Sequence, residues 1–121
     1  MEREEPKKLK SKNLFVYGTL QHGLSRNYIL RGLKYEKATL SNYRMVTPRS
    51  LGFPFIIRDD SSNVRGEVYF DLENSLINQI DIIEGEGELY HRILVNVGLD
   101  SGIKLEAFTY YPSEILIKNY I

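Results

Sequence analysis

Residues 14–20 read Leu-Phe-Val-Tyr-Gly-Thr-Leu. The apolar run at 14–16 is short and rich in strand-forming residues, which is typical of a strand buried on both faces. Gly18 then allows backbone angles that other residues avoid and lets another group come close to the main chain. A buried strand that ends in a glycine turn leaves N–H groups pointing in one direction, which favours a concave site for a carboxylate or phosphate. A strand followed by an ordinary turn fits the same residues, because one glycine is a weak signal.

The length and charge indicate one globular domain. The chain has 121 residues, enough to bury a core, and its 16 basic and 16 acidic side chains leave no net charge. We therefore expect neither nucleic acid nor a membrane as a partner. No cysteine is present, which excludes disulfides, thiolate catalysis and cysteine-ligated zinc. The two histidines, His22 and His91, lack metal-ligand spacing.

The composition also carries expectations about where the protein works. No apolar run reaches the length of a membrane span and no signal peptide is visible, so we expect a cytoplasmic protein. The lack of cysteine and tryptophan beside many Ile, Glu, Lys and Arg residues hints at a thermophile.

The first twelve residues differ from the rest of the chain. Residues 1–12 are mostly charged and contain Pro6, a pattern that predicts a flexible arm. The four lysines there could form a basic contact patch instead, but three acidic residues offset them. We expect a single domain over residues 13–121.

Strand patterns dominate that domain. Besides 14–16, we expect strands at residues 35–46, 54–57, 64–71, 90–97 and 103–111. The first of these should bend near residues 41–42, and the polar residues 58–63 predict a turn. Residues 100–102, Asp-Ser-Gly, predict a hairpin. Gly66 inside a strand indicates a bulge or a close backbone approach.

The stronger of two expected helices spans residues 72–84. Asp71 or Asn74 can cap its start, and Gly85 can cap its end. A weaker helix should begin at Ser25 and extend to Leu33, and residues 113–121 favour a docked helical turn. The pattern as a whole indicates an α+β domain built on an antiparallel, strongly curved or closed sheet.

Glu84 has an unusual place on the helix at 72–84. At about 100° per residue it falls between Ile77 and Ile80 in projection, on the apolar face. Burial disfavours a charged carboxylate, so its pKa should rise from about 4.3 toward the 6–7 that suits a general acid–base. At the last turn the side chain could instead bend into water, although a carboxylate at a helix C-terminus opposes the helix dipole.

Other candidate residues carry weaker signals. Glu67 alternates with apolar neighbours and is expected to face solvent. His91 fits a half-buried core histidine as well as a catalyst, and Arg92 can meet a carboxylate or decorate a sheet face. Phe53 and Phe55 can pack under a loop or line a pocket. We expect no nucleophilic triad, and nothing matches a P-loop or a dinucleotide fingerprint.

Five motifs follow one another in a specific order and spacing. They are Phe15-Val16-Tyr17-Gly18-Thr19-Leu20, Phe53-Pro54, Gly66-Glu67-Val68-Tyr69, Asp81-Ile82-Ile83-Glu84-Gly85 and Tyr90-His91-Arg92. Together they resemble the gamma-glutamylcyclotransferase-like family, in particular its small members, gamma-glutamylamine cyclotransferase and the avirulence-induced-gene-like proteins. The resemblance implies a small mixed, mainly antiparallel β-barrel with flanking helices.

The resemblance also implies a site and a reaction. In the family, the loop after the first strand holds the α-carboxylate of a gamma-glutamyl group, and a helix-end glutamate is the acid–base. Carried over, Glu84 is catalytic. The expected substrate-binding residues are Tyr17, Gly18, Thr19 and Leu20, with Tyr90 and Tyr110 as candidates for a further hydrogen bond to the carbonyl or carboxylate.

The implied product is 5-oxoproline, released together with an amine or amino acid and without a metal or cofactor. The expected partner is a small gamma-glutamyl compound, and the chain is expected to be a monomer or a homodimer. A module that binds a small carboxylate or phosphate in the same place without turning it over is the alternative function.

Overall fold

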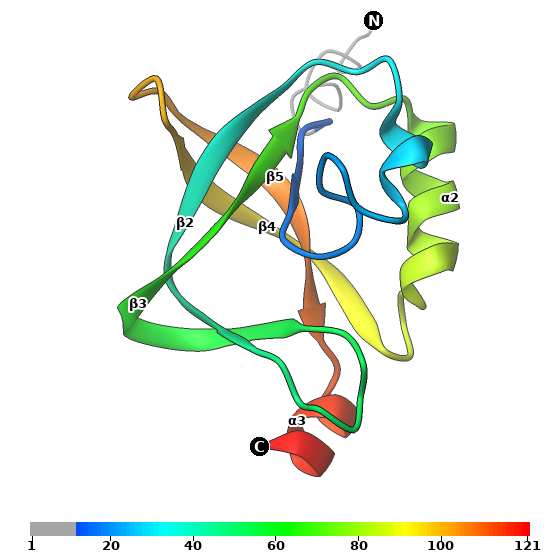
Figure 1. The fold of residues 1–121 in the computed structure, drawn as a ribbon, viewed down its shortest axis with the longest axis vertical. Helices are drawn as coiled ribbons and strands as arrows, with labels where there is room; N and C mark the ends of the chain where they lie inside the picture. The colour runs from blue at the N-terminus through cyan, green and yellow to red at the C-terminus, as the bar shows by residue number, and fades with distance from the viewer. Residues whose placement is uncertain (1–11) are drawn as a thin grey trace, which may run out of the picture.

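The computed structural model describes residues 12–121, in which five strands close into a barrel in the order β1-β3-β2-β4-β5 (Figure 1). The strands are β1 (Leu14–Val16), β2 (Tyr35–Val46), β3 (Phe55–Tyr69), β4 (Tyr90–Leu99) and β5 (Lys104–Pro112). The helices are a short 3-10 helix η1 (Asn27–Leu30), α2 (Asn74–Glu84) and α3 (Glu114–Tyr120). Of the pairings among these five strands, only that of β1 with β5 is parallel, so the predicted mixed, mainly antiparallel barrel is confirmed.

The predicted arm at residues 1–12 lies outside the described residues, except for Lys12. The Lys12 carbonyl accepts a hydrogen bond from the Leu72 N–H at 2.9 Å. In Figure 1, α2 runs along one side of the barrel and α3 follows the end of β5. No helix within residues 12–121 has both the length and the apolar character needed to cross a bilayer.

β2 and β3 form one long hairpin, and the turn predicted at residues 58–63 is wrong. β3 continues through this stretch, and the register shifts where Asn42 of β2 faces residues 59–62. The Asp59 carboxylate accepts hydrogen bonds from the Ser61 N–H and the Ser62 hydroxyl at 3.0 and 3.1 Å. The polar residues thus satisfy one another inside a bulge, which bends the strand without ending it. The predicted bend near residues 41–42 is confirmed by the positive φ of 72° at Asn42.

The helix ends show which local signals the chain uses. Gly85 adopts a left-handed φ of 70° and caps α2, as predicted. The predicted N-caps Asp71 and Asn74 are wrong, because Glu73 occupies that position and makes no side-chain capping bond. The helix predicted from Ser25 to Leu33 is also wrong: only the single turn of η1 forms, after Arg26. The helical turn predicted at residues 113–121 is confirmed and corresponds to α3.

Two apolar clusters fix the barrel and place α2 against it. One joins residues from all five strands, including Phe15. The other packs α2 and η1 against the barrel and includes Leu14 and Val16, so β1 is buried on both faces as predicted. A Cβ at Gly66 would lie 2.7 Å from the Phe15 ring and closer still to the Val16 carbonyl oxygen, which confirms the predicted close approach. This packing brings the end of β1 next to the end of α2.

Candidate functional site

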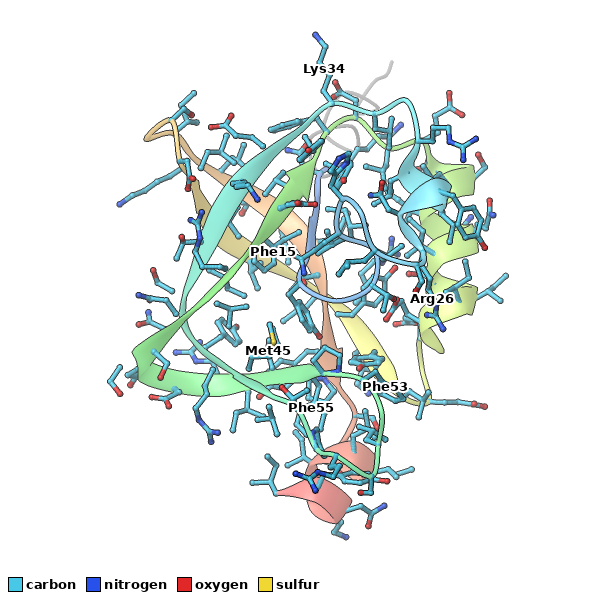
Figure 2. All side chains as sticks on the ribbon, in the orientation of Figure 1. Phe15, Arg26, Lys34, Met45, Phe53 and Phe55 are labelled. Atoms are coloured by element: carbon cyan, nitrogen blue, oxygen red, sulfur yellow. The ribbon has the colours of Figure 1, made fainter. Side chains whose placement is uncertain are left out.

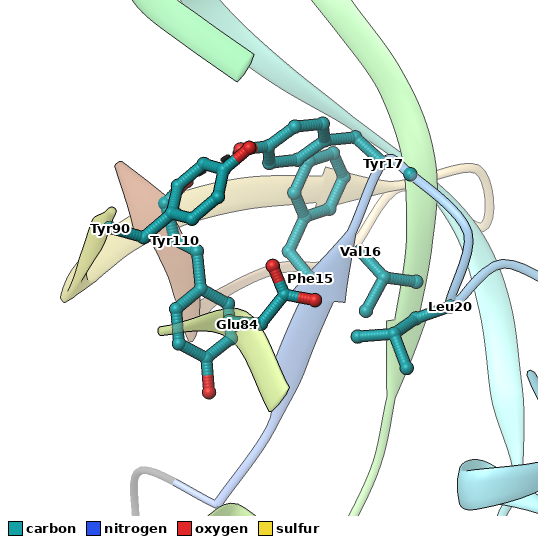
Figure 3. Close-up of a pocket in the computed structure, with 8 residues that line it drawn as sticks. Phe15, Val16, Tyr17, Leu20, Glu84, Tyr90 and Tyr110 are labelled. Carbon is teal, nitrogen blue, oxygen red and sulfur yellow. Dashed lines mark hydrogen bonds between the residues drawn. The ribbon is translucent and has the colours of Figure 1, made fainter. Parts of the chain in front are cut away.

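A small cavity lies between the end of β1 and the end of α2 (Figure 3). Its volume is about 30 Å³, enough for about one or two water molecules. Six of the seven site residues predicted from the sequence line it: Tyr17, Gly18, Leu20, Glu84, Tyr90 and Tyr110. The remaining walls come from Phe15 and Val16. The structure therefore brings together predicted site residues as distant in the chain as Tyr17 and Tyr110, which are 93 positions apart.

A larger pocket of about 240 Å³ adjoins this cavity. Glu84 and Tyr90 line both spaces, and the seventh predicted residue, Thr19, lines the larger one. Phe53 lines this pocket and packs its ring 6.1 Å from that of Tyr90, whereas Phe55 is fully buried in the core. We call the two spaces the inner cavity and the outer pocket.

Glu84 is the last residue of α2, and its side chain is 17% exposed. Figure 3 shows its carboxylate pointing into the inner cavity among the labelled side chains. Burial raises the pKa of Glu84, and the Arg26 guanidinium, whose Nη1 lies 3.8 Å from Oε2, opposes this rise. The position predicted from the helical projection is confirmed, since the carboxylate does not bend out into water.

Three tyrosines surround the inner cavity, and each hydroxyl already donates a hydrogen bond. Tyr17 donates to the Tyr110 carbonyl at 2.7 Å, and Tyr90 donates to the Pro54 carbonyl at 2.7 Å. Tyr110 donates to Asp81 Oδ1 at 2.6 Å. Burial raises the pKa of all three phenols, so they stay protonated at neutral pH.

Asp81 and Arg92 hold Tyr110 from outside the inner cavity. The Arg92 Nε lies 3.6 Å from Asp81 Oδ1, and its guanidinium sits 4.7 Å above the Phe108 ring. Of the two roles open to Arg92, contact with a carboxylate is thus the one observed. His91 is exposed and lines neither the inner cavity nor the outer pocket.

In the loop after β1, the carbonyl groups of residues 18–20 accept hydrogen bonds, but their N–H groups are open, meaning that no acceptor within residues 12–121 pairs with them. Gly18, Thr19 and Leu20 accept hydrogen bonds on their carbonyl oxygens from the Gln21 N–H, the Arg26 N–H and the Asn27 amide at 3.1, 2.9 and 2.8 Å. Within residues 12–121 the N–H groups of these three loop residues donate to no protein acceptor. Open N–H groups beside a cavity can bind an anion. Gly18 itself lacks a positive φ, so that part of its predicted role is wrong.

Glu67 was predicted to face solvent, and this prediction is wrong. Its side chain is 4% exposed and accepts hydrogen bonds from the His22 N–H at 2.7 Å and the Tyr69 hydroxyl at 3.2 Å. The Asn27 amide completes the group by donating to the Tyr69 hydroxyl at 2.8 Å. Glu67 therefore attaches the loop that follows β1 to β3. Strand alternation gave no sign of this, because the covering loop comes from a distant part of the chain.

The match to known proteins extends over nearly the whole described chain. The family model described as gamma-glutamyl cyclotransferase, AIG2-like, matches residues 14–119. A Methanocaldococcus jannaschii protein named as a candidate gamma-glutamylcyclotransferase is 30% identical over 105 residues, which cover 84% of each chain. Gamma-glutamylaminecyclotransferase A from Danio rerio is 30% identical over 112 residues, which cover 84% of this chain and 69% of the relative.

Solved structures agree with this match. An Arabidopsis thaliana protein solved in solution superposes with a TM-score of 0.74 at 30% identity. The superposition covers 93% of this chain and 66% of the Arabidopsis chain.

Proposed function

The chain belongs to the gamma-glutamyl cyclotransferase, AIG2-like family, and on this basis we propose that it cyclises the gamma-glutamyl group of a small substrate to 5-oxoproline, releasing an amine or amino acid. One observation carries the proposal. A largely buried carboxylate, that of Glu84, lines the same cavity as the loop residues Gly18 and Leu20, whose N–H groups have no protein acceptor within residues 12–121. An acid–base and an anion site are the two groups that this cyclisation requires.

The first step is the folding of the substrate into the site. The open N–H groups of residues 18–20 bind the α-carboxylate, which places the α-amino group and the γ-carbonyl of the same glutamyl unit near Glu84. Holding two reacting groups together in this way removes much of the entropic barrier to ring closure. The inner cavity alone is too small for a glutamyl unit, so the substrate also extends into the outer pocket.

Proton transfer through Glu84 then drives the reaction. The carboxylate takes a proton from the α-ammonium group, and the resulting amine attacks the γ-carbonyl carbon. The bond from this carbon to the leaving nitrogen breaks as Glu84 returns the proton to that nitrogen. The ring nitrogen passes its extra proton to the departing amine, so the products are 5-oxoproline and an ammonium group, with no net release of protons.

The surroundings of Glu84 suit both halves of this cycle. Burial raises the pKa of Glu84 toward neutral pH, which makes its carboxylate a stronger base and its protonated form more available as a proton donor. The nearby Arg26 guanidinium stabilises the anion and so opposes this rise in the pKa of Glu84. A group that must accept and then donate a proton works best when neither form dominates.

The test is 5-oxoproline release from a panel of gamma-glutamyl amino acids, gamma-glutamyl amines and gamma-glutamyl-ε-lysine, measured by mass spectrometry. Release from at least one member supports the proposal. Calorimetric binding of the panel without release from any member would favour the alternative, a module that binds a small carboxylate or phosphate. The cytoplasmic location, the thermophilic source and the monomeric or homodimeric state stay predictions from the sequence.

A further inference from the structure

Arg26 is tied to the loop after β1 by a backbone hydrogen bond, and its side chain lines the outer pocket next to Glu84. Its N–H donates to the Thr19 carbonyl at 2.9 Å, which ties it to the loop with the open N–H groups. Its side chain is 47% exposed and lines the outer pocket. Figure 2 shows Arg26 beside α2. Arg26 is therefore held at the entrance to Glu84.

In the described part of the chain, the Arg26 guanidinium is the only cation that lines the inner cavity or the outer pocket. Among residues 12–121, no other basic residue lines the inner cavity or the outer pocket, and Glu84 is the only acidic residue that does. The 3.8 Å separation between Arg26 and Glu84 is longer than a charge-assisted hydrogen bond of about 2.7–2.9 Å. Within residues 12–121 the Arg26 side chain donates no hydrogen bond to a protein acceptor, so its planar set of donors is available for a carboxylate.

The distances favour a carboxylate attached close to the leaving nitrogen. In the proposed reaction this nitrogen must come within about 2.6–3.2 Å of Glu84 to receive its proton. In an α-amino acid the carboxyl carbon is two bonds from the nitrogen, about 2.5 Å away. That places the carboxylate within reach of a guanidinium that lies 3.8 Å from Glu84. In an ε-linked lysine the carboxylate is six bonds away, and a simple amine has none.

The other walls of the outer pocket limit the leaving group further. Phe53, Ile83 and Leu89 supply apolar surface, and the volume of about 240 Å³ is below the roughly 300–1,000 Å³ of pockets for drug-sized ligands. Such a space suits an uncharged side chain of modest size.

From these observations we infer that Arg26 selects the leaving group: the preferred substrate is a gamma-glutamyl α-amino acid with an uncharged side chain, and Arg26 binds its α-carboxylate. This inference rests on the proposed function. It assigns Arg26 a role in specificity and predicts that amines and ε-linked lysine are poorer leaving groups.

The test compares two substrates that differ only in the carboxylate, gamma-glutamyl-alanine and gamma-glutamyl-ethylamine. The readout is the ratio of their kcat/KM values, because any effect of Arg26 on Glu84 acts on both substrates and cancels in the ratio. For the wild type we expect a ratio of about 10–100 in favour of the alanine substrate, the usual range for a hydrogen bond to a charged group. Arg26→Gln should bring the ratio close to one, and Arg26→Lys should keep part of it because the charge remains without the planar fork.

Arg31→Gln is the matched control, since Arg31 is exposed five residues along the chain and lines neither space. It should keep the wild-type ratio. A wild-type ratio near one, or an Arg26→Gln ratio equal to that of the wild type, overturns the inference while leaving the proposed function intact. An absence of 5-oxoproline from every substrate overturns both.

Discussion

Glu67 offers a test of whether the loop after β1 is held in place by a buried carboxylate. Glu67→Ala removes the acceptor for the His22 N–H and the Tyr69 hydroxyl, at 2.7 and 3.2 Å. Two hydrogen bonds to a charged group contribute about 1.5–3 kcal/mol each. The exposed His22 N–H can bond to water instead, whereas the buried Tyr69 O–H is left without an acceptor, because its bond with Asn27 uses only the hydroxyl oxygen. We therefore expect a smaller net loss, about 2–3 kcal/mol in the free energy of unfolding.

The assay is thermal unfolding combined with steady-state kinetics. For a chain of this length about 1 kcal/mol corresponds to roughly 4 °C, so the melting temperature should fall by about 8–12 °C. Because the loop also carries the open N–H groups, KM should rise roughly tenfold, with a smaller change in kcat. Glu67→Gln retains a carbonyl acceptor and should recover more than half of the loss. Glu106→Ala, an exposed substitution on β5, should stay within about 0.5 kcal/mol of the wild type. A Glu67→Ala protein that melts with the wild type would refute this reasoning.

Two further predictions concern packing and pH. Gly66→Ala should destabilise the protein by at least about 3 kcal/mol in urea unfolding, because the new methyl group meets the Phe15 ring and the Val16 carbonyl. A wild-type midpoint would contradict this contact. The raised pKa of Glu84 means that the folded protein keeps a proton which the unfolded chain releases above about 4.5. The free energy of unfolding of the wild type should therefore fall, relative to that of Glu84→Gln, as the pH rises from about 4.5 through the pKa of Glu84 in the folded protein, and then level off. Melting temperatures of the two proteins that change in parallel across this range would contradict the burial of Glu84.

The elements predicted correctly from the sequence are those encoded by neighbouring residues. Gly85 ends α2 because the left-handed conformation favours glycine, and the Asp-Ser-Gly turn at 100–102 reverses the chain between β4 and β5. The apolar run at 14–16 has no polar face to expose. The helical position of Glu84 was also a local signal, because the 100° rotation fixes its side of α2.

The errors occur where distant residues decide the local structure. The polar stretch at 58–63 resembles a turn, but pairing with β2 keeps it within a strand and leaves only a bulge. The segment after Ser25 is too short to form a stable helix, and its bonds to the preceding loop leave one 3-10 turn. Glu67 is positioned by its contact with His22, 45 residues away, and Arg26 lies close to Glu84, 58 residues away. Neither contact can be predicted from the neighbouring residues in the sequence.

The most direct test of the central claim is the rate of 5-oxoproline formation by Glu84→Gln at saturating substrate, with Glu88→Gln as the matched control. Glu88 is exposed on the loop after α2 and lines neither the inner cavity nor the outer pocket. General acid–base groups contribute about 10²–10⁴-fold, so Glu84→Gln should lose at least about 100-fold in kcat while Glu88→Gln keeps the wild-type value. A folded Glu84→Gln protein that forms 5-oxoproline at the wild-type rate would contradict the account.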